Sequence, residues 1–153
     1  MKKGFTLVEL LVVIVIIAIL ASLLLPALGR VLCNGRAAGV TTLVNQLSQA
    51  CKMYEQDQNV YPPEMASYDA AALVVPLSTP GPKRVPYFEF QPGTLNASGS
   101  IINLLYPSTE ILRYRNNAPN WPANISDPTA HNKTSVDLWA RDCSGVPDGI
   151  NGW

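Results

Sequence analysis

The stretch Lys2-Lys3-Gly4-Phe5-Thr6-Leu7-Val8-Glu9 opens the chain, and an almost unbroken apolar run continues from it to Leu28. As a helix, the run from Phe5 to Leu28 rises roughly 36 Å, which is enough to cross a bilayer. Its one strongly polar side chain is Glu9. An ionisable residue in hydrocarbon is costly and normally has a partner. The chain therefore begins with a membrane-length helix whose single charge needs an explanation.

The residues around Glu9 supply one. Gly4-Phe5-Thr6-Leu7-Val8-Glu9-Leu10 resembles the leader of prepilins and pseudopilins of the type IV pilin-like family. The resemblance implies that a membrane peptidase removes residues 1–4 by cutting after Gly4, and that the new N-terminal residue, Phe5, is N-methylated. The alternative is an ordinary signal anchor whose glutamate lies at the headgroup level.

Cleavage gives Glu9 a partner. The new amine of Phe5 lies about one helical turn from this carboxylate. In a filament, the resemblance implies, Glu9 pairs with the Phe5 amine of a neighbouring subunit. Because an unpaired charge in lipid is costly, the pair favours docking onto the growing end. Glu9 is therefore the predicted assembly residue.

Pro26 and the flanking charges describe the rest of the span. A proline inside a helix removes a backbone hydrogen bond and clashes with the preceding turn, so we expect a kink or local melting near residues 22–26. The alternative is that Pro26 merely ends the span.

Basic residues are denser before the span (Lys2, Lys3) than after it (Arg30, Arg36). This bias predicts a cytoplasmic N-terminus and a C-terminal domain on the far, periplasmic side of the inner membrane.

Composition limits the part of the chain beyond the span. The chain has 153 residues, of which about a hundred remain for one small domain. Eleven basic and eleven acidic residues give zero net charge, so there is no electrostatic case for nucleic-acid binding. Thirteen prolines and ten glycines predict a loop-rich domain.

Three cysteines leave the disulfide state open. Cys33 and Cys51 fall on one predicted helix, roughly 27 Å apart, and cannot bridge each other within a subunit. Cys143 can in principle reach either. One bridge with a spare thiol and three small buried hydrophobes are the two alternatives.

Helical period continues beyond the span. Apolar residues recur three and four positions apart and polar residues occupy the other side, as in a half-buried helix. We expect this helix to cover residues 29–58 and to end near Asp57-Gln58-Asn59, because Tyr61-Pro62-Pro63 cannot continue it. The apolar stripe is Val40, Leu43, Val44, Leu47, Ala50, Cys51 and Tyr54.

Residues 59–153 are predicted to form the small globular domain. Short segments with β-branched, aromatic or alternating character alternate with turn residues, and residues 100–106 fit either a helical turn or a strand. Three or four antiparallel strands across the long N-terminal helix give an α+β arrangement that resembles the pilin fold. The predicted strands are Leu73–Leu77, Val85–Phe90, Ile111–Arg115 and Val136–Ala140.

The tail from Asp137 to Trp153 crowds oxygen-bearing side chains among glycines. Such a segment suits Ca²⁺, which takes about six to eight oxygen ligands. The alternative is a glycine-rich turn closed by hydrogen bonds from nearby amides to Asp142 and Asp148. The candidate ligands are Asp142, Ser144, Asp148 and Leu138.

Parts of this tail resemble the end of the major pseudopilin of type II secretion systems. The matching parts are Asp137-Leu138-Trp139, Asp148-Gly149 and Ile150-Asn151-Gly152-Trp153. The run of residues 51–57 into Tyr61-Pro62-Pro63 resembles the helix end of the same protein. The resemblance implies a loop that holds structural Ca²⁺, although this loop is shorter, has fewer acids and carries Cys143.

We find no catalytic constellation in the sequence. His131, the single histidine, lies in a predicted surface loop over residues 116–132, and Cys143 has no recognisable activating base. We attribute to chance three Asn-x-Ser/Thr triplets that match the glycosylation pattern, at Asn96, Asn124 and Asn132.

These features together predict a pseudopilin-like structural subunit of a type II secretion pseudopilus. Its expected partners are other copies of itself, the prepilin peptidase, the inner-membrane secretion platform and other pseudopilins. The nearest alternative is a type IV pilin for adhesion, motility or DNA uptake. A more distant one is a binding module that the span merely anchors.

Overall fold

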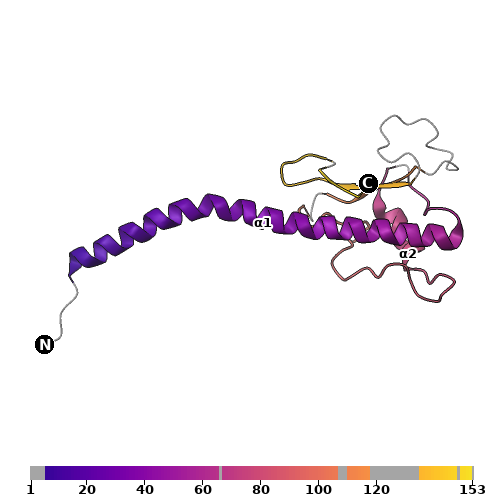
Figure 1. The fold of residues 1–153 in the computed structure, drawn as a ribbon, viewed down its shortest axis with the longest axis horizontal. Coiled ribbons are helices and arrows are strands. Elements are labelled where there is room, and N and C mark those ends of the chain that lie inside the picture. The colour runs from indigo at the N-terminus through magenta and orange to yellow at the C-terminus, as the bar shows by residue number, and fades with distance from the viewer. Residues whose placement is uncertain (1–5, 66, 107–109, 118–134, 148, 153) are drawn as a thin grey trace. The chain divides into compact units, whose positions relative to one another are not determined.

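The computed structural model describes residues 6–65, 67–106, 110–117, 135–147 and 149–152. For residues 26, 27 and 30 it describes the backbone alone. Contacts divide the chain into two compact units, Met1–Gly35 and Arg36–Trp153. The elements in chain order are a long helix, a 3-10 turn, a short helix and three strands (Figure 1).

Helix α1 runs from Leu7 to Gln58. Its first part, Leu7–Leu25, has a mean hydropathy of 3.2 and none of it is buried within the structure. By length and composition this segment is able to cross a membrane, as the sequence predicted. The backbone stays helical through residues 22–26, so local melting at Pro26 is not observed, and the kink stays a prediction.

The C-terminal end of α1 is set by Asn59. Its φ of 59° lies in the left-handed region, which asparagine tolerates better than most residues. Its backbone N–H donates to the carbonyl of Glu55 at 2.7 Å, which satisfies one of the free carbonyls of the last turn. The predicted end of the helix at residues 57–59 is confirmed.

The second half of α1 buries the predicted stripe. Six of its seven residues are buried, and Tyr54 packs partly buried against the core. The polar positions between them, such as Thr41, Asn45 and Gln49, are exposed. Ser48 joins the buried face near the C-terminal tail. The hydrophobic period therefore predicted the buried face of this helix correctly.

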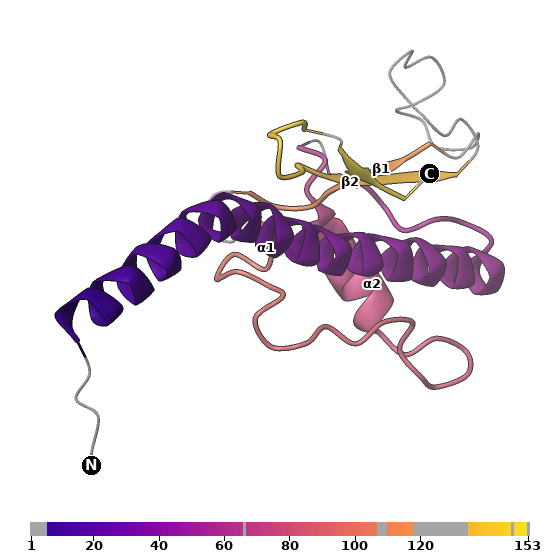
Figure 2. The ribbon, with the colours of Figure 1, turned by 60° about the vertical axis from the view of Figure 1, so that its left-hand side comes forward.

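Residues 70–78 are helical, and the predicted strand over Leu73–Leu77 is wrong. The 3-10 turn η1 covers Ala70–Leu73 and helix α2 covers Val74–Ser78. Asp69 starts them, because its Oδ1 accepts the N–H of Ala71 at 2.8 Å. Ala70, Leu73 and Leu77 are fully buried at helical spacing. In Figure 2 these turns lie beside the second half of α1.

Three antiparallel strands form one sheet in the order β1-β2-β3. β2 covers Val136–Ala140, as predicted, whereas β1 covers Arg113–Asn116 and begins two residues later than expected. β3, Ile150–Asn151, was not predicted as a strand. Tyr114 lies opposite Leu138 in the ladder, and both side chains are fully buried. The α+β class is confirmed.

The predicted strand over Val85–Phe90 is also wrong. The N–H groups of Tyr87 and Phe88 both donate to the carbonyl of Leu77, at 2.9 and 3.0 Å. The segment therefore packs at the end of α2 rather than in the sheet. Residues 100–106 divide between the two alternatives: Ile101 and Ile102 form isolated bridges, and a turn comes after them.

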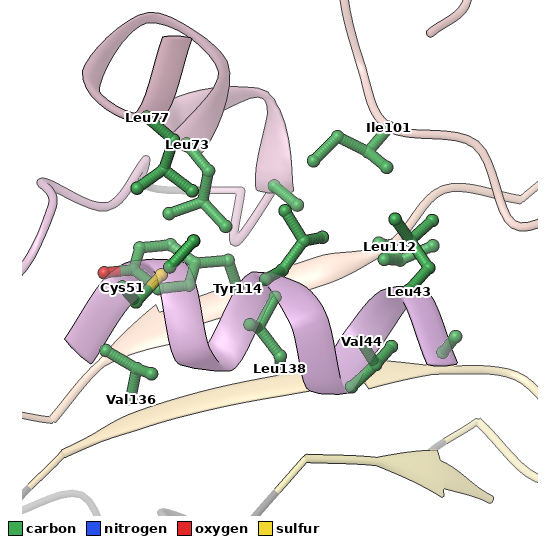
Figure 3. Packing of buried hydrophobic residues seen from close by; sticks show 14 of the residues in the cluster. Leu43, Val44, Cys51, Leu73, Leu77, Ile101, Leu112, Tyr114, Val136 and Leu138 are labelled. Carbon is green, nitrogen blue, oxygen red and sulfur yellow. The ribbon is translucent and has the colours of Figure 1, made fainter. Parts of the chain in front are cut away.

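One hydrophobic core joins these elements within residues 36–153 (Figure 3). Cys51 of α1 lies on the side of Leu73 and Leu77 of the helical turns, Leu43 lies beside Leu112, and Tyr114 comes in from the sheet. The hydroxyl of Tyr114 donates to the carbonyl of Pro62 at 2.7 Å, so this buried polar group is satisfied.

Candidate functional site

The predicted assembly residue, Glu9, caps the N-terminus of its own helix. Its Oε2 accepts two hydrogen bonds from Thr6, one from the backbone N–H at 2.9 Å and one from the hydroxyl at 2.8 Å. In return, the Glu9 N–H donates to the Thr6 Oγ1 at 3.2 Å. This reciprocal pair is a capping box, which satisfies two otherwise free N–H donors at the start of α1.

Thr6 is the capping partner of Glu9, and this pairing was not predicted. The signal was present, because Thr6-Leu7-Val8-Glu9 matches the Ser/Thr-x-x-Glu pattern of a capping box directly before an apolar run. Gly4 and Phe5, the predicted cleavage and methylation residues, lie outside the described residues. The structure thus gives the carboxylate a partner within its own chain.

Three of the four predicted metal ligands, Asp142, Ser144 and Asp148, fall in the sequence between β2 and β3. Oδ1 of Asp142 accepts the N–H groups of Ser144 at 2.8 Å and Val146 at 2.9 Å. A side chain on Gly149 would collide with the Asp142 carboxyl group, so the loop backbone also encloses this side of it. Asp142 therefore ties the loop together through its amides, as in the alternative of a hydrogen-bonded turn.

Of the other candidate ligands, Leu138 lies outside the loop. Leu138 is buried in β2, and its carbonyl accepts the N–H of Gly152 at 3.0 Å. Ser144 is exposed, and Asp148 lies outside the described residues. Across the described residues no three His, Cys, Asp or Glu side chains come together closely enough to hold a metal ion.

Neighbouring side chains anchor the loop from outside, which the sequence did not indicate. Nη1 of Arg141 donates to the carbonyl of Gly145 at 3.1 Å. Its Nε lies 3.2 Å from Oε1 of Glu110, in an ion pair without hydrogen-bond geometry. Tyr106 donates its hydroxyl to the carbonyl of Asp142 at 3.0 Å, and the Asn103 amide donates to that of Arg141 at 2.9 Å.

The three cysteines differ in state. Cys33 and Cys143 are each disulfide-bonded, whereas Cys51 is a buried free cysteine. Burial raises the pKa of the Cys51 thiol to about 12. Because the thiolate is the reactive form, this thiol is inert in the folded chain.

Known proteins share the N-terminal sequence motif of this chain. Residues 1–25 match the prokaryotic N-terminal methylation motif. The type IV wide pilus major component PilA4 of Thermus thermophilus is 43% identical over 71 residues, which are 46% of this chain and 54% of the relative. The fimbrial protein EcpC of Eikenella corrodens is 37% identical over 73 residues, 48% of each chain.

A secretion protein is similar over a comparable length. The type II secretion system core protein G of Pectobacterium carotovorum is 40% identical over 87 residues, 56% of this chain and 54% of the relative. The chain spans about half the length of the curated relatives it matches. No solved structure matches it.

The long apolar helix and the small antiparallel sheet form an α+β arrangement that is consistent with the pilin-like fold. Residues 1–25 carry the methylation motif, and over about half of its length the chain is similar to type IV pilin and pseudopilin proteins. None of the relatives' names denotes an enzyme.

Proposed function

We propose that this chain is a structural subunit of a filament, processed by a prepilin peptidase between Gly4 and Phe5 and methylated at Phe5. The matched methylation motif over residues 1–25 carries the proposal. The apolar segment Leu7–Leu25, unburied within the structure, supports it, because such a surface needs either lipid or other apolar helices around it. The subunit performs no reaction itself.

Assembly in this proposal exchanges one partner of Glu9 for another. In the monomer, the carboxylate accepts from Thr6, at 2.8 and 2.9 Å. These bonds reduce the cost of holding the carboxylate near the membrane but leave its charge without a counter-charge. The Phe5 amine of a neighbouring subunit supplies that counter-charge, and the pair adds an attraction between opposite charges that a bond from a neutral hydroxyl lacks. The exchange therefore favours the filament.

Among filaments, we place the chain in the pseudopilus of a type II secretion system, which drives protein export across the outer membrane. The observation behind this choice is the tail, in which Asp137-Leu138-Trp139 forms part of β2 and Ile150-Asn151 forms β3 around the Asp142 loop. This is the region in which the sequence resembles a major pseudopilin. The similarity to a type II secretion core protein G supports it.

A type IV pilus subunit is the second candidate. Two of the relatives carry pilus or fimbrial names, and their identities of 43% and 37% are close to the 40% of the secretion protein. Both candidates share the processed leader, the membrane helix and the polymer, so the choice concerns only the machine that the filament belongs to.

Deletion of the gene separates the two candidates. We expect the deletion strain to lose export of folded proteins into the medium and to keep its surface pili and twitching motility. Loss of pili or motility with unchanged export would assign the chain to a pilus. The subunit is expected in the inner membrane as a single-pass protein, with the domain over residues 59–153 in the periplasm and the secretion platform and other pseudopilins as partners.

This function does not depend on the Ca²⁺ that the resemblance implies. The residues proposed for processing and assembly, Gly4, Phe5 and Glu9, are at the other end of the sequence from the predicted ligands. Whether the Asp142 loop binds Ca²⁺ is therefore a separate question, which concerns the stability of the domain.

A further inference from the structure

The Asp142 loop has the two features that a structural cation normally supplies. A cation gathers oxygen atoms from several points of a loop and brings positive charge to its carboxylates. Here the loop amides are gathered by the carboxylate of Asp142, which accepts the N–H groups of Ser144 and Val146. The loop is thus drawn around a carboxylate that accepts N–H donors, rather than around a cation that gathers oxygens.

The positive charge is supplied by Arg141. Its guanidinium donates to the Gly145 carbonyl at 3.1 Å and lies 3.2 Å from the carboxylate of Glu110. A carbonyl and a carboxylate are the oxygen groups that Ca²⁺ prefers. Arg141 therefore occupies oxygens of the kind that a calcium ion would take, and its fixed charge opposes a second cation nearby.

The predicted ligands also fit a calcium ion poorly, because oxygen atoms of two of them already accept hydrogen bonds from backbone amides. Ca²⁺ takes about six to eight oxygens. Of the described candidates, Asp142 has Oδ1 bonded to two amides, and Leu138 has its carbonyl bonded to the N–H of Gly152. Ser144 is exposed and contributes its N–H to the loop.

We propose that the C-terminal loop of this subunit closes without a metal ion, with Asp142 collecting the loop amides and Arg141 holding the loop to Glu110. The domain folds to the same stability with and without calcium. Assembly of the filament is then independent of the calcium concentration outside the cytoplasm. The inference concerns the loop alone and stands whichever filament the subunit belongs to.

Calcium titration of the full chain in detergent tests the proposal. We expect the thermal midpoint to be the same in EGTA and in millimolar Ca²⁺, and calorimetry to show no saturable heat. A midpoint that rises with Ca²⁺, or a saturable binding heat, would overturn the proposal.

Two substitutions separate the carboxylate–amide arrangement from a calcium site. Asp142→Ala removes the acceptor of two amides and lowers the midpoint in EGTA by about 4–8 °C. Ser144→Ala is the matched control: it keeps the N–H that the loop uses and removes the hydroxyl that a cation would use, so the midpoint stays unchanged. An unchanged midpoint for Asp142→Ala in EGTA contradicts the proposal. If Asp142→Ala does not fold, Arg141→Met replaces it, and the same lowering is expected.

Discussion

At the scale of single residues, the proposed assembly depends on Glu9. Its carboxylate is satisfied within the chain by both donors of Thr6, so the monomer is tolerable before assembly. The bond is local, because it joins two residues at the start of α1. A neighbour's amine is therefore able to take over the carboxylate.

Replacing Glu9 tests this role. We expect Glu9→Ala to leave cleavage after Gly4 intact and to abolish assembly, because the neighbour's Phe5 amine then has no counter-charge in lipid. The measurements are the mass of the processed subunit and the yield of sheared filaments. Thr6→Ala is a useful comparison, since it removes one donor and keeps the carboxylate. A filament yield from Glu9→Ala equal to that of the unsubstituted chain would contradict the role.

Gly152 is a second single residue with a testable role, because it lets the C-terminal tail pack closely against α1. A Cβ there would lie 2.6 Å from Oγ of Ser48 and 2.8 Å from Cγ1 of Val44, closer than packed atoms allow. We expect Gly152→Ala to lower the free energy of unfolding by about 1–3 kcal/mol, as overpacking does. Denaturant unfolding of the detergent-solubilised chain measures it.

Gly39 provides the control for that substitution. A Cβ at this helical position meets nothing within 4 Å. Gly39→Ala is therefore expected to raise stability by up to about 1 kcal/mol, because alanine favours the helix more than glycine does. If both substitutions had the same sign, steric contact at Gly152 would not explain the result.

At the scale of elements, the sequence predicted the features that periodicity controls. The stripe along α1 was correct because burial there repeats with one clear helical period. The strand Val136–Ala140 was correct for its residue types instead, since four of its five residues are buried without alternation. The prediction of a strand within residues 70–78 was wrong. The residue types of Val74, Val75 and Leu77 suggested a strand, whereas the Asp69 cap starts a helix. β3 has two residues, too few to show a period. Its strand state depends on pairing with β2, which is a property of the folded domain.

The candidate sites divide in the same way. The leader was predicted from the sequence because its signal is a set of residue types at consecutive positions of the chain. The closure of the Asp142 loop was readable only as one of two alternatives, because Glu110, Tyr106 and Asn103 reach it from about thirty or more positions earlier in the chain. Sequence distance hides such contacts.

At the scale of the whole molecule, thiol chemistry reports the folded state. With Cys33 and Cys143 disulfide-bonded and Cys51 buried, we expect the folded chain to take up no alkylating reagent. Unfolding without reduction exposes Cys51 for one adduct, and reduction exposes all three cysteines. Mass spectrometry counts the adducts. Rapid alkylation of Cys51 in the folded chain would contradict its burial.

The same thiol predicts how stability changes with pH. The folded pKa of Cys51, about 12, lies above its ordinary value of 9.0. The contribution of the neutral thiol is therefore fully present below pH 9.0 and is lost as pH rises toward 12. Denaturant unfolding at a series of pH values, with Cys51→Ala as the control, measures this loss. A Cys51→Ala chain with the same decline between these values would assign it to other groups.

The central claim is that this chain is a processed, type IV pilin-like filament subunit. Mass spectrometry of the N-terminal peptide of the membrane-extracted protein tests it most directly. We expect a chain that begins at Phe5 and carries one N-methyl group, with residues 1–4 absent. A chain that retains residues 1–4, or one cut after the apolar run near Leu28, would contradict it.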